Sequence, residues 1–253
     1  MGATSHTLRQ RHGLFDHPLL LASAVDPGER DQSDGDNGEY DQDPFASHPA
    51  ILARSRSPTI AHAAMTLDAP SLSDAEIRKL VERLDRPIVL VGMMGVGKST
   101  VGRKLATLLH LDFRDADDEI EEAAQMSVGE IFERFGEAYF RAGERRVIAR
   151  LLDGGRAVIA TGGGAFVQAD TRELILERGI AIWLDADVDT LVDRVRRKDT
   201  RPLLRDGDPR EIVARLKAER EPAYALAPIH VPSGGGPHSD AVARIVQELD
   251  QWQ

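Results

Sequence analysis

The sequence predicts an α/β domain in which helices cover both faces of a parallel β-sheet. From residue 88 onward, short runs of apolar residues alternate with longer stretches that show helical periodicity. The short runs are mostly apolar throughout, which is typical of strands buried on both faces of a sheet. A glycine-rich loop directly follows the first run and opens the next helix. With 253 residues, 42% of them hydrophobic, the chain is long enough to bury one large core.

The expected elements begin with a helix whose N-cap is Ser73. Glu76 stands three residues later, which is the capping-box spacing, and Pro87 ends the helix. This amphipathic helix belongs to residues 65–86, which lead into a domain expected at 87–253. The expected strands are Ile88–Val91, 113–115, Ala157–Ala160, 181–184 and 229–231. The helices that follow are expected at 97–109, across 117–152, and at 170–178, 187–196, 209–221 and 240–251.

Residues 1–64 differ in composition from the rest and are predicted to be a disordered acidic arm. Between Asp26 and Asp43 the chain carries eight acidic side chains, against the single cation of Arg30. Such a stretch repels itself and buries too little apolar surface to offset the entropy of ordering it.

Part of this arm has features of a secretory signal peptide. Arg9 and Arg11 precede three leucines, and a small-residue Ala-Ser-Ala stretch follows. Asp16 and Pro18 interrupt the apolar region, which is too short for such a peptide, so we expect a cytoplasmic protein. A natural start at Met65 is an alternative that the sequence leaves open.

Composition argues against several classes of protein. The chain has no cysteine, which excludes disulfides, thiolate zinc sites and a cysteine nucleophile. No run of about 18 apolar residues occurs, so we expect no membrane span, and the pI near 5.3 argues against an anionic membrane as a partner. The formal net charge of −10 argues against nucleic acid as a partner. An anionic ligand would therefore need a local cationic site.

The strongest motif is a phosphate-binding loop at residues 92–99. Its sequence, Gly-Met-Met-Gly-Val-Gly-Lys-Ser, satisfies the G-x-x-x-x-G-K-[ST] pattern. Glycines let backbone amides turn toward phosphate oxygens, and the helix N-terminus adds a favourable dipole. We expect Lys98 to reach the β- and γ-phosphates of a nucleotide and Ser99 to ligate Mg²⁺. The residues expected to bind the nucleotide in this loop are Gly95, Val96, Gly97, Lys98, Ser99 and Thr100.

Asp115 and Asp117 come at the carboxyl end of the second expected strand, where ligands bind in open α/β sheets. On an extended segment their spacing sends both carboxylates to one face, where one could hold a Mg²⁺ water and the other approach an acceptor hydroxyl. The alternative is a helix N-cap followed by an acidic first turn, since further acidic residues follow.

A run of three glycines, residues 162–164, follows the strand Ala157–Ala160, again at a carboxyl end. Glycines there let the backbone approach a ligand closely, whereas a simple turn needs only one or two. A second triplet, residues 234–236 between two prolines, has the composition of a plain connection.

Three arginines are candidates for anion binding. Arg141 lies early in a helix, Arg201 lies in a loop rich in basic residues, and Arg220 lies near the end of a helix. For each arginine alone, a solvated surface charge is the alternative, and Arg220 could complement the helix dipole. The basic loop in an acidic chain favours a cover over phosphates.

Together these motifs resemble those of the shikimate kinase family. The resemblance covers about residues 87–251, and the motifs agree with the family in order and spacing. They are the phosphate-binding loop, Asp115-Ala116-Asp117, Gly136-Glu137 through Phe140-Arg141 and Glu144, residues 162–164, Arg201-Pro202-Leu203-Leu204, and Arg220-Glu221-Pro222-Ala223-Tyr224. The family implies a monomer with a three-layer P-loop kinase fold, five parallel strands in the order 2-3-1-4-5, and a lid at about 196–208.

The resemblance implies a reaction and a role for each matching residue. The reaction transfers the γ-phosphoryl group of ATP to the 3-hydroxyl of shikimate with Mg²⁺ bound, and Asp117 would orient or deprotonate that hydroxyl. The other implied roles are phosphate contacts for Lys98 and Arg201, stacking near the adenine for Arg194, the shikimate carboxylate for Arg141 and Arg220, the shikimate ring for Gly162, Gly163 and Gly164, support of Mg²⁺ through water for Asp115, and orientation of Arg141 for Glu144. The loop at 233–239 lacks the basic side chain that the family often carries near the adenine.

Three alternatives remain at this level. A related small-molecule kinase, such as one for gluconate, would share the phosphate-binding loop but not the set formed by Asp117, Arg141, Gly163 and Arg220. A non-catalytic nucleotide-dependent switch would act through the acidic arm and would bind ATP without turnover. A nucleic-acid kinase is disfavoured by the net charge and by the lack of stripes of aromatic and basic residues.

Overall fold

The computed structural model describes Phe45, residues 73–196 and residues 208–252. The predicted disordered arm at 1–64 therefore lies outside the described residues except for Phe45. The same holds for residues 65–72 of the leading segment and for nearly all of the predicted lid, including Arg201.

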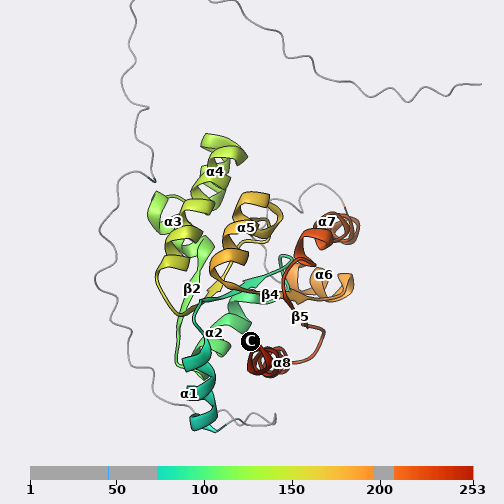
Figure 1. Cartoon of the computed structure of the whole chain (residues 1–253). Helices are drawn as coiled ribbons and strands as arrows, with labels where there is room; N and C mark the ends of the chain where they lie inside the picture. The colour runs from blue at the N-terminus through green and yellow to red at the C-terminus, as the bar shows by residue number, and fades with distance from the viewer. Residues whose placement is uncertain (1–44, 46–72, 197–207, 253) are drawn as a thin grey trace, which may run out of the picture. The chain divides into compact units, whose positions relative to one another are not determined.

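The centre of the fold is a parallel sheet of five strands in the order β2-β3-β1-β4-β5 (Figure 1). The strands are β1 (Ile88–Val91), β2 (Asp112–Asp115), β3 (Ala157–Ala160), β4 (Ile180–Asp185) and β5 (Ile229–Pro232). The first residue of β1, Ile88, pairs with Val158 on one side and with Ile180 on the other. All four residues of β1 are buried, as its apolar sequence requires. The predicted strand positions and strand order are confirmed.

Helices cover both faces of this sheet. They are α1 (Asp74–Arg83), α2 (Lys98–Leu109), α3 (Ala116–Ala124), α4 (Val128–Asp153), α5 (Ala169–Arg178), α6 (Val188–Arg196), α7 (Pro209–Tyr224) and α8 (His238–Gln251), with a short 3₁₀ helix at Ala165–Val167. In Figure 1, α2 and α8 lie on one side of the strands and α4 and α5 on the other. Because side chains alternate along a strand, Leu90 packs toward α2 while Val89 packs toward Leu152 of α4.

Three local features differ from the expectation or extend it. Asp117 lies inside α3, which begins at Ala116, so the segment is not extended at that point. The long α4 is broken at Gly136, whose φ of 78° lies in the left-handed region. The capping box at the start of α1 is present as predicted, with the Ser73 and Glu76 side chains each accepting from the other's backbone amide.

The buried apolar residues form two clusters of unequal size. The larger cluster joins the five strands to the helices on both faces. The smaller cluster lies between α3 and α4, and its buried members are Ile120, Ala124, Ile131, Phe140 and Val147. Phe45 packs against this smaller cluster. The two helices that carry Asp117 and Arg141 are therefore held by a small core of their own.

The strand order decides where functional residues can meet. In a parallel sheet, every loop that leaves a carboxyl end lies along the same edge. Because β3 lies between β2 and β1, the loops after these three strands are neighbours. The phosphate-binding loop, the two aspartates and the glycine run follow β1, β2 and β3 respectively.

The loop that follows β1 depends on glycine at its first position. Gly92 has a φ of 132°, and a Cβ there would overlap the backbone carbonyl oxygen of Leu184 in β4. We expect Gly92→Ala to lower the free energy of unfolding by at least about 2 kcal/mol, because the strain and the overlap act together. Denaturant unfolding of both proteins measures this.

The matched control is Gly129→Ala on the exposed first turn of α4, where an added Cβ would lie 4.0 Å from its nearest neighbour, the Ser127 hydroxyl. This change should be neutral or slightly stabilising. Equal stability of the two variants would contradict the account of the loop.

Candidate active site

The phosphate-binding loop forms a concave run of backbone amides at the start of α2. Gly95 and Gly97 have φ values of 80° and 102°, and α2 begins at Lys98. Its N-cap, Gly97, makes no side-chain capping bond, so the first amides of the helix are not used by a cap. Turned-in amides followed by a helix N-terminus favour a bound phosphate.

Lys98 lies within this loop, with only 8% of its surface exposed. Its Nζ donates to the carbonyl oxygens of Gly92 and Met93, at 2.8 Å and 3.0 Å. A buried ammonium requires such partners, because desolvating it without hydrogen bonds is costly. These contacts hold the cation at the mouth of the loop, where it can reach a bound phosphate.

Asp115 links the phosphate-binding loop to α3. The Ser99 hydroxyl donates to Asp115 Oδ2 at 2.7 Å, and Asp115 Oδ1 accepts from the backbone amide of Asp117 at 3.2 Å. Asp115 is therefore the N-cap of α3, which was the alternative interpretation, and it also accepts from Ser99; its support of Mg²⁺ stays a prediction. The argument from alternation along an extended segment was wrong for Asp117, because that residue lies in the first turn of α3.

The glycine run after β3 meets acidic side chains from α3 and α4. A Cβ on Gly162 would lie 2.8 Å from Asp117 Oδ1 and 3.0 Å from Glu144 Oε1. A Cβ on Gly164 would lie 2.6 Å from Arg141 Nη2. Any side chain at either position would displace these charged groups. Glycine at both positions therefore lets the backbone of the run lie directly against the charged side chains.

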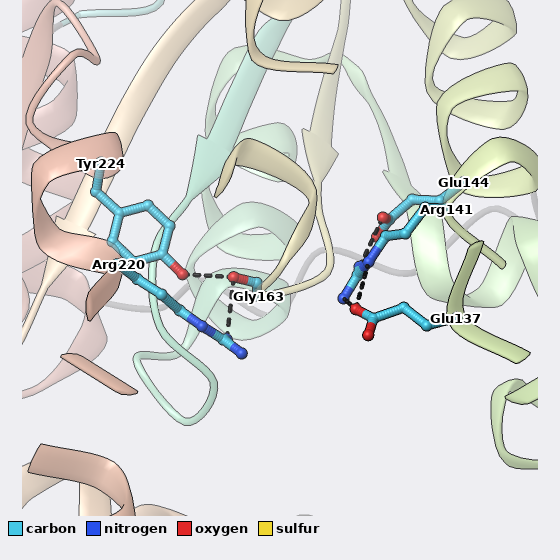
Figure 2. A network of polar contacts seen from close by, with 6 residues as sticks. All are labelled: Glu137, Arg141, Glu144, Gly163, Arg220 and Tyr224. Atoms are coloured by element: carbon cyan, nitrogen blue, oxygen red, sulfur yellow. Dashed lines mark hydrogen bonds and ion pairs between the residues drawn. The ribbon is translucent and has the colours of Figure 1, made fainter. Parts of the chain in front are cut away.

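Arg141 is held by two carboxylates of its own helix (Figure 2). Its Nη1 donates to Glu144 at 2.8 Å, and its Nε and Nη2 donate to a single oxygen of Glu137 at 3.2 Å and 3.1 Å. Burial lowers the pKa of Arg141, but the hydrogen bonds and charges of Glu144 and Glu137 together outweigh burial, so the pKa is raised overall. The guanidinium is thus a fixed positive charge.

Glu144 is almost fully buried, and burial raises the pKa of this carboxyl group. Arg141 opposes the shift, whereas the charges of Asp117 and Glu137 add to it. Within the described part of the chain, Glu144 Oε1 has no hydrogen-bond partner. The atom lies against Gly162, on the same side as the Asp117 carboxylate.

A second arginine approaches the glycine run from α7. Arg220 Nη1 donates to the Gly163 carbonyl oxygen at 3.4 Å, and the Tyr224 hydroxyl donates to the same oxygen. Burial raises the pKa of Tyr224 to about 12, so the phenol keeps its proton in neutral solution. In Figure 2, Arg141 from α4 and Arg220 from α7 extend toward each other from opposite sides of Gly163. Two cations around one backbone loop favour an anionic ligand.

Arg194 connects the phosphate-binding loop to the loop before α8. Its Nη1 donates to Val96 O at 2.9 Å, and its Nη2 donates to Gly234 O at 2.7 Å. His238, the first residue of α8, lies beside Gly97, and burial lowers the pKa of its imidazole. A depression of about 170 Å³ lies beside the loop before α8, and Pro232 is one of the residues that line it.

The structure brings most of the predicted residues to one edge of the sheet. Arg201 lies outside the described residues. Sequence reasoning assigned no role to Tyr224, Glu137 or His238. Tyr224 and Glu137 stood inside quoted motifs, which was the available signal, whereas nothing in the sequence pointed to His238.

Comparison with known proteins gives a consistent result. The family model described as shikimate kinase matches residues 94–250. A shikimate kinase of Novosphingobium aromaticivorans is 62% identical over 192 residues, covering 74% of this chain and the whole of that protein. A shikimate kinase of Caulobacter vibrioides is 57% identical over 166 residues, covering 66% of this chain and 83% of that protein.

Solved structures agree with these relatives. A shikimate kinase from Acinetobacter baumannii in complex with shikimate is 38% identical, with a TM-score of 0.65, covering 69% of this chain and 97% of that one. A shikimate kinase from Aquifex aeolicus is 33% identical, with a TM-score of 0.58, covering 65% of this chain and 96% of that one.

The raised pKa of Glu144 predicts a pH dependence of stability. Its ordinary value is 4.5, and the folded protein binds the proton more tightly than the unfolded chain does. As the pH rises from 4.5 through the raised value, ionisation of the buried group therefore costs stability. Glutamine does not titrate, so the free energy of unfolding of the wild type minus that of Glu144→Gln should fall across this window and be flat above it.

Denaturant unfolding at a series of pH values measures this difference. A difference that instead grows with pH would show that the ion pair with Arg141 holds the pKa of Glu144 below its ordinary value.

Proposed function

This chain belongs to the shikimate kinase family, and we propose that the residues gathered at the carboxyl edge of its sheet carry the reaction of that family. The reaction transfers the γ-phosphoryl group of ATP to the 3-hydroxyl of shikimate and gives shikimate 3-phosphate and ADP. The observation that supports the assignment most is the placement of Arg141 and Arg220 around Gly163, next to Asp117 and to the phosphate-binding loop.

ATP binds at the start of α2 in this proposal. The amides of residues 95–100 surround the β- and γ-phosphates, and Lys98 contributes a positive charge. The two carbonyl contacts of Lys98 support the role, because they hold Nζ near the phosphate position before the nucleotide binds. Arg194 supports the nucleotide side by fixing the loop at Val96 against the loop at Gly234.

Ser99 and Asp115 fit a magnesium ion that accompanies ATP. Their oxygens lie 2.7 Å apart, and hydroxyl and carboxylate oxygens are ligands that Mg²⁺ prefers. Among the described residues no group of three or more acidic or histidine side chains could hold a metal by itself. This suits an ion that keeps several waters and takes its other ligands from the phosphates. When bound, Mg²⁺ neutralises charge on the β- and γ-phosphates.

Shikimate is an anionic polyol. The residues around Gly163 provide groups for its carboxylate, its ring and its 3-hydroxyl. Arg141 and Arg220 bind the carboxylate, since a planar guanidinium suits a carboxylate geometrically. Glu144 and Glu137 fix the Arg141 side chain, and the backbone of Gly163 lies along the ring. Asp117 accepts a hydrogen bond from the 3-hydroxyl and takes its proton as the oxygen attacks the γ-phosphorus.

The chemistry depends on position and charge rather than on a covalent enzyme intermediate. Phosphoryl transfer requires the attacking oxygen and the leaving oxygen to lie in line with the phosphorus. Lys98 stabilises the charge that develops on the phosphates, while the two arginines fix the acceptor at its other end. Arg201, assigned to the phosphates by sequence resemblance, stays a prediction because it lies outside the described residues.

The proposal also includes a cytoplasmic, monomeric enzyme without a nucleic-acid or membrane partner. The family resemblance and the cysteine-free composition support the cytoplasm. Of the helices that the structure describes, none is long and apolar enough to cross a bilayer.

Turnover of Mg-ATP by the full chain tests the assignment of the acceptor. ADP release is expected with shikimate, but not with gluconate or without an acceptor. Lys98→Ala should keep the fold, measured by circular dichroism, and should lower kcat at least about 100-fold. ATP binding without turnover of shikimate would contradict the proposed function, and an active Lys98→Ala variant would remove the lysine from the mechanism.

Arg141→Lys separates the two substrates. Lysine keeps the charge but loses the fork of donors, so the KM for shikimate should rise about tenfold or more while the KM for ATP changes little. Steady-state kinetics with each substrate varied in turn measures both constants. An equal rise in the two constants would show that Arg141 does not act on the acceptor.

A further inference from the structure

Phe45 lies far upstream of the region that matches the family model, yet it contacts α4. Its ring centroid is 5.8 Å from that of Tyr139, and the guanidinium carbon of Arg146 lies 5.2 Å from the Phe45 ring centre. Both distances are typical of favourable aromatic and cation–π contacts. Phe45 is half-buried by these contacts.

Gly143 makes room for the ring. A Cβ built on Gly143 would lie 2.5 Å from two ring atoms of Phe45 and 3.1 Å from a third. Gly143 is buried although it lies in the middle of a helix, where glycine costs stability relative to alanine. The missing side chain forms a notch on α4 between Tyr139 and Arg146, and the Phe45 ring fills this notch.

The notch lies on the side of α4 opposite to Arg141, the arginine on this helix that we propose binds the acceptor. Residues of an α-helix are spaced about 100° apart, so Tyr139, Gly143 and Arg146 share one face. By the same spacing, Arg141 and Glu144 lie on a face roughly 160° away. Phe45 therefore packs on one face of α4 and does not cover the opposite face, which carries Arg141 and Glu144.

The position matters because this part of the molecule has little core of its own. The cluster between α3 and α4 has five buried members, whereas the main core has many more. Asp117 is carried by α3 and Arg141 by α4, so the packing of these two helices sets the distance between the two groups. One additional aromatic ring is a large addition to such a small cluster.

We propose that Phe45 is an intramolecular anchor that packs in the Gly143 notch of α4 and thereby holds Arg141 in position for the acceptor. The second half of this statement rests on the proposed function, while the first half does not. Phe45 is a positioning residue in this proposal, since it acts through α4 and touches no substrate.

Amide hydrogen exchange tests the anchor without relying on activity. In the full chain, Phe45→Ala should speed exchange in residues 137–147 of α4 and leave the strands unchanged. The matched control is Phe15→Ala, which removes the other phenylalanine of the first 72 residues and should change neither region. Unchanged exchange in α4 of Phe45→Ala would overturn the anchor.

Kinetics tests the positioning role. Phe45→Ala should raise the KM for shikimate about threefold to tenfold, with the KM for ATP and kcat within about twofold of the wild type. Phe45→Leu, which keeps an apolar side chain, should restore most of the affinity. Gly143→Ala should match Phe45→Ala, because its methyl group occupies the notch, and the double variant should be no worse than either single one.

The outcomes separate the two claims. Faster exchange together with equal rises in both KM values, or additive effects of the two substitutions, would leave Phe45 a stabilising contact and overturn the positioning role. A wild-type chain that does not turn over shikimate would contradict the proposed function, while the exchange measurement would still decide the anchor.

Discussion

The contact between two glycine loops at the edge of the sheet is the constraint on which the site depends. The Thr161 amide and hydroxyl both donate to Leu90 O, at 3.2 Å and 3.1 Å, and tie the end of β3 to β1. Beyond this point a Cβ on Gly163 would lie only 3.3 Å from the backbone nitrogen of Met94. The phosphate-binding loop and the glycine run, which we propose to hold the two ligands, therefore lie side by side. Direct transfer between two ligands requires this proximity.

The cations of the candidate site stand in a chain whose net charge is negative. The chain carries a formal net charge of −10, yet Lys98, Arg141 and Arg220 all lie at the carboxyl edge of the sheet, where we propose that the ligands bind. Each has an oxygen partner from the protein, so each is held in place before a ligand arrives. Cations fixed in this way add to transition-state stabilisation because little reorganisation is needed during the reaction.

Features encoded by local periodicity or by contiguous motifs could be predicted from the sequence. The buried strands, the phosphate-binding loop and the capping box are of this kind. Features that depend on tertiary packing could not be predicted. The hydrogen bond of Tyr224 to the glycine run and the packing of Phe45 on α4 both join segments whose proximity no local pattern encodes. The extended segment was expected to reach Asp117, which instead lies in the first turn of α3, because a four-residue strand that runs directly into a helix leaves no signal at the junction.

The central claim is that two arginines recognise a carboxylate on the acceptor. Comparing shikimate with its methyl ester tests this claim directly on the wild-type chain, because the ester keeps the ring and its hydroxyls but has no charge at that position. The account predicts that kcat/KM falls at least about 30-fold for the ester, since truncating one side of a buried charge pair costs a few kcal/mol. The loss should shrink in a variant that already lacks the arginine fork. An ester turned over as well as shikimate would contradict the account.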